Sequence, residues 1–431
     1  MKNKFRWGCI QPLTGGMYLG AEEAIGHPAE WILSFNGLDD VKYDKDNNIT
    51  TAGNEYNLIK YLEDNNRCPD YYKIYDHGMF STDINNYNPV IKHNDVLENP
   101  NYDDIDLVVA VPVCSGLSMA TSGSKENKDT KNNNMLWITN YTLNVIKPKI
   151  YIFENAPTMM GSRGDDLRIK LEEIAKNTCY SILYYKTDTA KHNNCQNRPR
   201  TFIIFQKHVN NGIQRPVLYN FENKPIDVMT FFNNISESLP QSEPVKTGIH
   251  NIMITEYYND TFGKNWMDNV TEKLNLMDSL IKKNQLQNFI DYIENSDKWS
   301  NDEKEKALKY VKHIKYKKSL GLNYYGADIQ LYKKDFPSVQ FRSIHNLFHP
   351  LGKRTCTVRE FLSLMGMPED FILYGDESNL PKIGQNVPVK TAKYIVSEAV
   401  RIIQNWGNDE RESDCNAVFI NNINETIELV A

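Results

Sequence analysis

Two residues that could do covalent and acid–base chemistry stand at the ends of apolar runs in the first half of the chain. Cys114 ends the run DLVVAVPVC, and a polar stretch rich in Ser, Gly, Lys and Asn follows it. Glu154 comes directly after Ile-Tyr-Ile-Phe. A carboxyl group is costly to bury there unless it is paired, so Glu154 is either a functional acid or a charge at a sheet edge. Cys114 is either one more small apolar residue or a thiol presented as a nucleophile.

A third segment adds positive charge. The stretch CQNRPRTFII places Gln196, Arg198 and Arg200 at alternate positions before another apolar run. Side chains two residues apart in an extended segment point to the same side, so both arginines are predicted to face one way. An ordinary ion-paired face explains this pattern equally well.

Glycines and carboxylates at other predicted strand ends could bind a nucleotide-like ligand. The stretch PLTGGMYLG places Gly15 and Gly16 between a strand and a helix, where the missing side chains would let a ligand approach the backbone. Glu55 in GNEYNLIKYL and Asp95 in KHNDVL offer carboxylates to hydroxyl or amino groups. The full GxGxxG spacing is missing, which argues against a dinucleotide. A tight structural turn and two surface acids explain the same residues.

The elements that must position these residues alternate between strands and helices. Apolar runs of strand length occur at Trp7–Leu13, Leu107–Val113, Ile150–Phe153, Ser181–Tyr185 and Phe202–Phe205. Helical patterns occur at Met17–Ile25, Met135–Ile146 and Asp165–Asn177, the second with Met135, Ile138, Thr142 and Val145 on one face. This alternation predicts an α/β fold with a mostly parallel sheet covered on both faces. Ligands bind at the carboxyl ends of the strands in such sheets.

Other segments interrupt or complete this pattern. Trp31–Gly53 is predicted to contain a hairpin around Asp46-Asn47-Asn48. The alternation ends after Phe205, and we expect a second, smaller domain over 207–353.

The end of the chain carries clear helix signals. TVRE at Thr357 is a capping box that predicts a helix over Val358–Met365, and Pro388 opens an amphipathic helix to about Gln404. The closing segment VFINNINETIEL is predicted to form a small hairpin.

Taken in order, these motifs resemble the cytosine-5 DNA methyltransferase family. The chain reads GG, NE, ND, PVC, ENA and QNRPR, followed by RTCTVRE and IGQNVPV. The family has FxGxGG, an acid after the second strand, an aspartate after the third, a PC nucleophile motif, ENV, QxRxR, RxxTxRE and GNxVP. The resemblance covers about 1–205 and 354–405. It implies a Rossmann-like S-adenosylmethionine-dependent methyltransferase domain over 1–206 and 354–410, a target-recognition domain over 207–353 and a tail over 411–431.

The resemblance also implies roles for the residues of the first half. Cys114 would add to carbon 6 of a cytosine turned out of double-stranded DNA, after which carbon 5 takes the methyl group. Glu154 would give a proton or a hydrogen bond to ring nitrogen 3, which requires a carboxyl pKa raised by burial. Arg200 would reach the base oxygen, Arg198 would steady the acid and the backbone, and Gln196 would position the segment.

The cofactor implied is S-adenosylmethionine. Gly15 and Gly16 would lie at its methionine and sugar region, Glu55 at the ribose hydroxyls and Asp95 at the adenine amino group. Thr14, Tyr56, Val96 and Asn386 would line the pocket. A flexible loop with Lys125, Lys128 and Lys131 would close over the DNA backbone once the base is in place.

The chain departs from the family pattern at four places. Gln11 and Leu13 replace the aromatic residue and first glycine of FxGxGG, Val113 and Ser115 flank the cysteine, Gly384-Gln385-Asn386-Val387 replaces GN(S/A)V, and Asp129-Thr130-Lys131 replaces D-x-R. All but the last touch the cofactor side of the expected pocket or the nucleophile turn. They leave room for a modified cofactor.

Composition limits the remaining possibilities. The 431 residues, 40% of them hydrophobic, contain no apolar stretch long enough for a membrane helix and no signal peptide. Seven scattered cysteines without a CxxC pair argue against a disulfide framework or a metal site and for the cytoplasm. The net charge of −6 argues against a wholly basic surface, although basic residues outnumber acidic ones between Asn301 and Glu360. We expect a monomer.

Two alternatives to a DNA methyltransferase stay open at this point. One is a tRNA cytosine-5 methyltransferase with the same catalytic domain, although the long 207–353 segment suits duplex readout better. The other is a non-catalytic DNA-binding protein that retains the fold. A dehydrogenase is disfavoured because no second glycine motif or His–acid pair is present.

Overall fold

The structure is a computed structural model with two compact units. It describes residues 4–35, 41–74, 83, 85–86, 100–113, 116–117, 125–208, 226–270, 274–321, 330–332, 346–351, 354–375, 379–406, 417–421 and 425–429. The first unit contains residues 1–194, 198–224 and 386–431, and the second contains 195–197 and 225–385.

The first unit is built on a nine-stranded sheet with the order β14-β13-β8-β9-β7-β6-β1-β2-β5. The strands are β1 (Trp7–Ile10), β2 (Trp31–Ser34), β5 (Tyr71–Ile74), β6 (Leu107–Ala110), β7 (Ile150–Asn155), β8 (Tyr180–Asp188), β9 (Pro199–Lys207), β13 (Ala417–Asn421) and β14 (Glu425–Leu429). Strands β5, β2, β1, β6 and β7 run parallel to one another. The predicted α/β fold with a mostly parallel sheet is confirmed.

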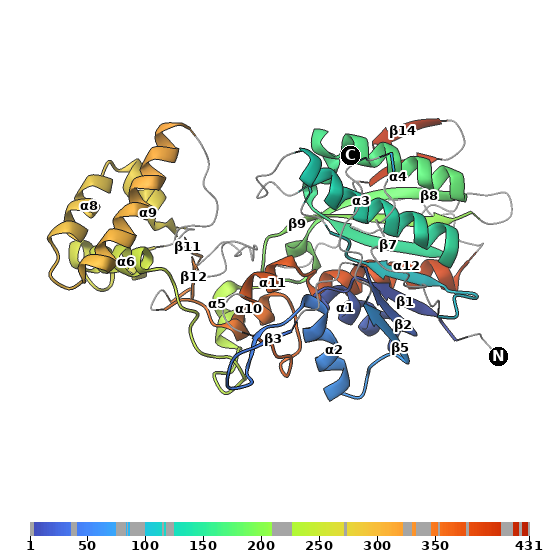
Figure 1. The fold of residues 1–431 in the computed structure, drawn as a ribbon, viewed down its shortest axis with the longest axis horizontal. Coiled ribbons are helices and arrows are strands. Elements are labelled where there is room, and N and C mark those ends of the chain that lie inside the picture. The colour runs from blue at the N-terminus through green and yellow to red at the C-terminus, as the bar shows by residue number, and fades with distance from the viewer. Residues whose placement is uncertain are drawn as a thin grey trace. The chain divides into compact units, whose positions relative to one another are not determined.

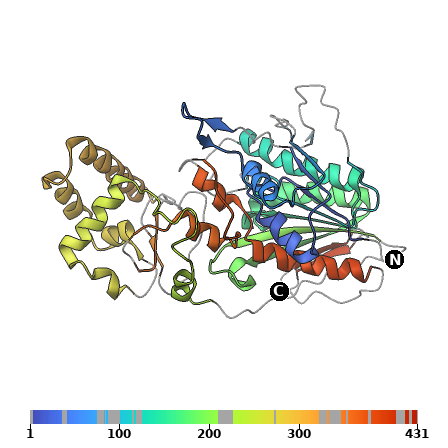
Figure 2. The ribbon, with the colours of Figure 1, turned by 90° about the horizontal axis from the view of Figure 1, so that it is seen from below.

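Helices cover both faces of this sheet, as the two views of the ribbon show (Figures 1 and 2). Helix α1 (Gly16–Ile25) packs along α12 (Val389–Gln404) on one face, and α3 (Lys125–Tyr141) lies beside α4 (Asp165–Thr178) on the other. Helix α2 (Asn54–Asp64) follows the short hairpin of β3 (Lys42–Tyr43) and β4 (Ile49–Thr51). The predicted hairpin around Asp46-Asn47-Asn48, the helix after Pro388 and the C-terminal hairpin are all confirmed.

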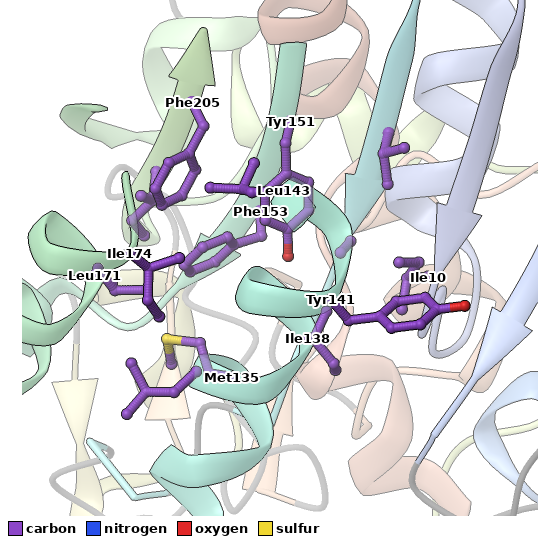
Figure 3. Packing of buried hydrophobic residues seen from close by; sticks show 14 of the residues in the cluster. Ile10, Met135, Ile138, Tyr141, Leu143, Tyr151, Phe153, Leu171, Ile174 and Phe205 are labelled. Atoms are coloured by element: carbon purple, nitrogen blue, oxygen red, sulfur yellow. The ribbon is translucent and has the colours of Figure 1, made fainter. Parts of the chain in front are cut away.

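The core between the sheet and helices α3 and α4 consists of large apolar side chains (Figure 3). Tyr151 and Phe153 alternate along β7 and stack against Phe205 of β9. Met135 of α3 and Leu171 of α4 are fully buried in the same cluster. Each such side chain contributes about 1.5–3 kcal/mol on burial, so this face holds the strand ends in fixed positions.

Helix α3 differs from the prediction in two ways. It begins at Lys125 rather than Met135, so Lys125, Lys128 and Lys131 belong to a helix and the loop predicted for them is wrong. Six of residues 125–134 are Asn, Asp or Thr, which are poor helix formers, so the local sequence indicated a loop where the structure has a helix. The helix ends in a π-helical turn over Thr142–Ile146, and the extra residue in that turn leaves Val145 45% exposed while Ile146 is buried.

Strand β9 runs antiparallel between β7 and β8. Its register pairs Glu154 with Phe202 and Asn155 with Thr201. A reversed strand begins where its parallel neighbours end. The chain therefore brings the start of β9, with Arg200, to the carboxyl end of β7, with Glu154.

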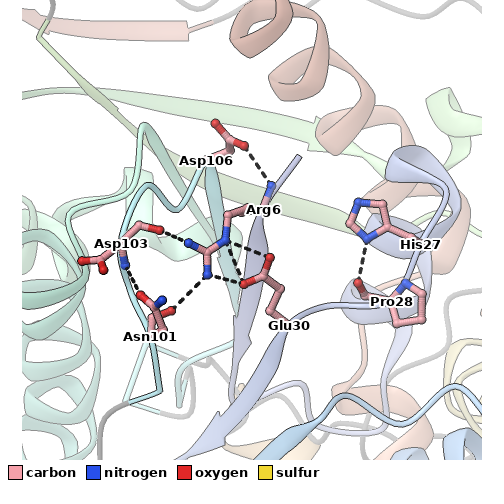
Figure 4. Close-up of polar contacts among 7 residues, drawn as sticks. All are labelled: Arg6, His27, Pro28, Glu30, Asn101, Asp103 and Asp106. Atoms are coloured by element: carbon pink, nitrogen blue, oxygen red, sulfur yellow. Dashed lines mark hydrogen bonds and ion pairs between the residues drawn. The ribbon is translucent and has the colours of Figure 1, made fainter. Parts of the chain in front are cut away.

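Charged side chains pair at the other end of the sheet, where the parallel strands begin (Figure 4). The Arg6 guanidinium donates from Nε to both carboxylate oxygens of Glu30, at 2.9 and 3.0 Å. Its backbone N–H donates to Asp106 at 2.9 Å, and Asp106 also pairs with Lys149 at 2.5 Å. These four residues directly precede β1, β2, β6 and β7, so they tie the amino ends of four parallel strands together.

The second unit contains a helical cluster and a three-stranded sheet. Its helices are α5 (Val228–Asn233), α6 (Ile249–Phe262), α7 (Leu276–Lys282), α8 (Leu286–Asn295), α9 (Asn301–Ser319), α10 (Val358–Leu364) and α11 (Leu380–Gln385). Strand β11 (Gln330–Leu331) lies between β10 (Leu274–Asn275) and β12 (Leu347–Phe348). Buried residues of α6 to α9, such as Phe289 and Val311, form a separate core.

The predicted capping box in the second unit is confirmed. The Thr357 side chain accepts from the Glu360 N–H, and the Glu360 carboxylate accepts from the Thr357 N–H. Arg359 is fully buried and donates to the carbonyl oxygens of Pro240, Pro368 and Phe371, so the guanidinium joins three backbone segments. Across the described residues, every helix is too short or too polar to cross a bilayer.

Candidate active site

A buried carboxyl group and an arginine meet where β7 ends and β9 begins. Arg200 Nε lies 2.5 Å from Glu154 Oε1, and the two side chains are 20% and 3% exposed. Among the residues that the structure describes, Glu154 pairs with Arg200 and has the apolar residues of β7 before it. The sequence predicted both residues, and the antiparallel register explains why they meet.

Burial sets the protonation of Glu154. Desolvation raises the pKa of its carboxyl group above the ordinary value, and the nearby positive charges of Arg200 and Arg198 oppose the rise without cancelling it. A carboxyl group with a raised pKa can carry a proton closer to neutral pH and donate it. The site therefore has the properties of a general acid.

The segment that carries the arginines is held at both ends by one carboxylate. Asp188 Oδ1 accepts from the backbone N–H of Ala190 at 2.9 Å and of Arg198 at 3.2 Å. Asn194, between them, donates to Thr391 of α12 at 2.9 Å. Sequence reasoning missed Asp188 and Asn194. An Asp at a strand end before a polar loop is a signal that could have found Asp188, because such side chains often bond nearby N–H groups.

Gln196 was predicted to position this segment. Its side-chain amide donates to the Leu364 carbonyl at 2.6 Å, and it is fully buried. Arg198 is also buried, at 2% exposure. Its positive charge lowers the pKa of Glu154, and its role in steadying that acid stays a prediction.

The predicted nucleophile, Cys114, lies outside the described residues, but the strand end that leads to it is described. The Val113 N–H donates to Asn134 Oδ1 of α3 at 3.2 Å. Asn134 is 2% exposed, and the sequence analysis did not single it out. Three consecutive asparagines inside a helical pattern were the available signal, because buried asparagines need partners.

The glycine turn between β1 and α1 is closely packed. Gly15 has φ 105°, a left-handed conformation that favours glycine. The Gly16 N–H donates to Asn386 Oδ1 at 2.8 Å, and a Cβ on Gly16 would lie 1.8 Å from the Val387 carbonyl oxygen. The structure therefore brings together Gly15, Gly16 and Asn386, which the sequence places some 370 residues apart.

The predicted ribose-binding acid is buried near the same turn. Glu55, in the first turn of α2, is fully buried and accepts from the Ser34 hydroxyl of β2 at 3.0 Å. The Thr14 hydroxyl donates to Asn54 Oδ1 at 3.5 Å, which links the glycine turn to α2. Tyr56 is partly buried in the same helix.

Two predicted residues of the pocket, Asp95 and Val96, lie outside the described residues. The side chains of Lys125, Lys128 and Lys131 are not described either. Within the part of the chain that the structure describes, no group of three or more His, Cys, Asp or Glu side chains could hold a metal ion.

Comparison with known proteins identifies the family. Residues 61–401 match the C-5 cytosine-specific DNA methylases. The chain belongs to this family. The methylase fold and the enzyme class predicted from the sequence, a DNA (cytosine-5-)-methyltransferase, are thereby confirmed.

Two relatives illustrate how far this methylase has diverged. It is 21% identical over 332 residues to the Type II methyltransferase M1.HphI of Haemophilus parahaemolyticus, which covers 77% of this chain and 76% of the relative. A solved structure of a protein encoded within an E. coli prophage, assigned as a DNA modification methyltransferase, superposes with a TM-score of 0.51 at 16% identity. That match covers 93% of this chain and 99% of the other, and it supports the Rossmann-like fold.

The residues of this methylase fit an adenosyl cofactor. Gly15 and Gly16 pack against Leu58 and Val387 of the protein itself, so the fit rests on the fully buried carboxylate of Glu55 on the next helix, α2, and on the start of α1. A buried carboxylate that bonds hydroxyl groups suits a ribose. The positive end of α1, which begins at Gly16, favours a carboxylate such as that of a methionine group.

Proposed function

We propose that this protein transfers a methyl group from S-adenosylmethionine to carbon 5 of a cytosine flipped out of double-stranded DNA, through a covalent adduct with Cys114. The observation that carries the proposal is Glu154. It is fully buried at the carboxyl end of β7, paired with Arg200, and its pKa is raised by burial.

The reaction needs both a nucleophile and an acid. Carbon 5 of cytosine is a poor nucleophile, and addition of the Cys114 thiolate to carbon 6 makes it electron-rich. The Glu154 carboxyl group donates a proton, or a strong hydrogen bond, to nitrogen 3 so that negative charge does not accumulate on the ring. Carbon 5 then forms a bond to the methyl group, whose bond to the sulfonium sulfur breaks to leave S-adenosylhomocysteine. A base such as a held water removes the proton from carbon 5, the bond between carbon 6 and the Cys114 sulfur breaks to release the thiolate, and any proton taken up by nitrogen 3 returns to Glu154.

The arginines complete the base pocket. Arg200 holds the Glu154 carboxylate in one orientation and is exposed enough to reach a base oxygen. Arg198 is buried, and its backbone N–H donates to Asp188, so we assign to it the role of steadying the acid and the backbone of this segment. Asn134 holds the backbone of Val113, the residue before the proposed nucleophile Cys114.

S-adenosylmethionine supplies the electrophilic methyl group when bound. Thr14, Gly15 and Gly16, with Asn386 bonded to Gly16, would hold its methionine and sugar region. Glu55 would accept from the ribose hydroxyls, and Tyr56, Asp95 and Val96 would complete the pocket. The 207–353 segment reads the target, and the enzyme acts as a monomer. The Type II name of the Haemophilus relative suits a restriction-modification setting.

Covalent trapping tests this proposal. Incubation with S-adenosylmethionine and a duplex containing 5-fluorocytosine should leave an adduct that survives denaturation, with mass spectrometry locating it at Cys114. Cys114→Ser should abolish both the adduct and methyl transfer, whereas Cys68→Ser, a substitution of an exposed cysteine, should change neither. An adduct on another residue, or methyl transfer to tRNA alone, would reject the proposal.

A further inference from the structure

A buried glutamine in the turn after β1 has no hydrogen-bond partner for its side chain. Gln11 is 0% exposed. Neither its amide nitrogen nor its amide oxygen is bonded to any residue that the structure describes. Most buried side-chain amides are satisfied, because an unpaired one destabilises the folded state. An unpaired, buried amide at a strand end therefore requires an explanation.

The backbone around Gln11 is also unusual. Gln11 has φ 49° and Leu13 has φ 53°, both left-handed conformations that disfavour residues with a side chain, and Gly15 follows with φ 105°. Strained backbone of this kind gathers at functional sites, where surrounding contacts maintain it. Gln11 thus lowers the stability of the folded protein in two ways, through its left-handed backbone conformation and through its unpaired side-chain amide.

Gln11 lies where the cofactor residues converge. Its backbone N–H donates to the Leu33 carbonyl at 2.7 Å, so it stands between the carboxyl ends of β1 and β2. The next residue of β2, Ser34, bonds Glu55, the acid assigned to the ribose. The glycine turn that begins α1 lies a few residues further along the chain.

The chemistry of an amide selects one part of the cofactor. A glutamine amide presents one donor and one acceptor in a plane, which matches the N6 amino group and N7 of adenine. The methionine end carries an ammonium and a carboxylate, and the carboxylate is better satisfied at the positive end of α1. The adenine amino group has two hydrogens, so Gln11 on the N7 side and Asp95 on the other side are compatible.

We infer that Gln11 is a specificity-determining residue that pairs with the N6 and N7 edge of the cofactor adenine. The inference rests on the proposed function, because it needs S-adenosylmethionine at this turn. It gives the replacement of the family's aromatic residue by glutamine a physical purpose, since an amide can donate and accept hydrogen bonds and an aromatic hydrocarbon ring cannot.

The test compares two substitutions of the same kind. Gln11→Leu removes the unpaired amide at the carboxyl edge of the sheet. The control, Gln206→Leu, removes a fully buried amide from β9 at the other end of the sheet, where Gln206 pairs with Ile150. Gln206 has interactions within the structure, whereas the Gln11 side chain has no partner among the described residues. The probes are S-adenosylhomocysteine and S-inosylhomocysteine, in which a carbonyl oxygen replaces the amino group, and calorimetry measures the Kd of each.

Gln11→Leu should weaken S-adenosylhomocysteine binding about tenfold, the effect of about one lost hydrogen bond. The wild type should bind the inosyl compound at least about tenfold more weakly than the adenosyl compound, and Gln11→Leu should lower this ratio severalfold, because only the contact assigned to Asp95 then distinguishes the two compounds. Without ligand, Gln11→Leu should keep or raise the Tm, whereas Gln206→Leu should lower the Tm and leave both Kd values unchanged.

Each result bears on a separate claim. Unchanged S-adenosylhomocysteine affinity in Gln11→Leu, or a lower Tm without ligand, overturns the role of Gln11. A lower affinity that leaves the discrimination against the inosyl compound intact overturns the pairing with adenine. A wild-type protein that does not bind S-adenosylhomocysteine would instead refute the proposed function, and this inference with it.

Discussion

The central sheet has charged pairs along its amino-terminal edge and buried polar groups along its carboxyl-terminal edge. Arg6, Glu30, Asp106 and Lys149 precede four parallel strands and pair with one another. At the other edge, Glu154 is buried with a raised pKa, and Gln11 is buried in a left-handed turn.

This difference separates stability from function within one sheet. The side chains of the Arg6–Glu30 pair at the amino end are each 25% exposed, so water still solvates these charges and the free-energy penalty of placing them in the protein is small. The groups at the carboxyl end have properties that cost stability, a shifted pKa and a strained turn, and they lie where the proposed chemistry takes place. We therefore expect substitutions at the carboxyl end of the strands to change kcat and substitutions at the amino end to change the free energy of unfolding.

The largest effect is expected at Glu154. Glu154→Gln removes the transferable proton and should lower kcat for DNA methylation about 10²- to 10⁴-fold. The matched substitution at the other edge, Glu30→Gln, should leave kcat near the wild-type value. Methyl transfer from labelled S-adenosylmethionine to duplex DNA measures both. Similar losses in the two variants would show that the edges do not differ in function.

The second effect concerns the pH dependence. The positive charge of Arg200 lowers the pKa of Glu154, against the larger raising effect of burial. Arg200→Ala should therefore raise that pKa further and keep Glu154 protonated to higher pH. Activity that requires protonated Glu154 falls as pH rises through its pKa, so this fall should move to higher pH in Arg200→Ala, along with a roughly tenfold lower kcat.

Arg200→Lys provides the control for charge, because it keeps the positive group beside the carboxylate. Its pH profile of kcat should stay close to that of the wild type even if its kcat is lower. A fall that moves to lower pH in Arg200→Ala would contradict the assignment of Glu154 as the acid.

The smallest effect is expected at the amino edge. Arg6→Ala removes the two-pronged pair with Glu30 and the tie to Asp103, and should lower the free energy of unfolding by about 1–2 kcal/mol. Urea denaturation measures this change, and Lys170→Ala, at an exposed helical pair with Glu173, should cost less than about 0.5 kcal/mol. The affinity for S-adenosylhomocysteine should not change in either variant. Weaker binding in Arg6→Ala would contradict the separation of the two edges.

Much of the fold was predictable because its signals are local. Apolar runs of strand length located β1, β6, β7, β8 and β9, and the capping box at Thr357 and the proline at 388 located two helices. Helix α3 was less predictable. Its first turns are polar, and a π-helical turn at its end changes which side chains are buried, which a regular helical period cannot show.

The sequence by itself determined the family, the order of the motifs and the residue types able to do the chemistry, since these depend on composition and spacing along the chain. Only the tertiary structure decided that Glu154 meets Arg200, that Asn386 closes the glycine turn and that the Gln11 side chain is buried without a partner among the described residues. The physical reason is that strand order, the reversal of β9 and burial bring together residues far apart in the chain. Burial also sets the pKa of Glu154 and leaves the Gln11 amide unpaired, and no local pattern of residues encodes either property.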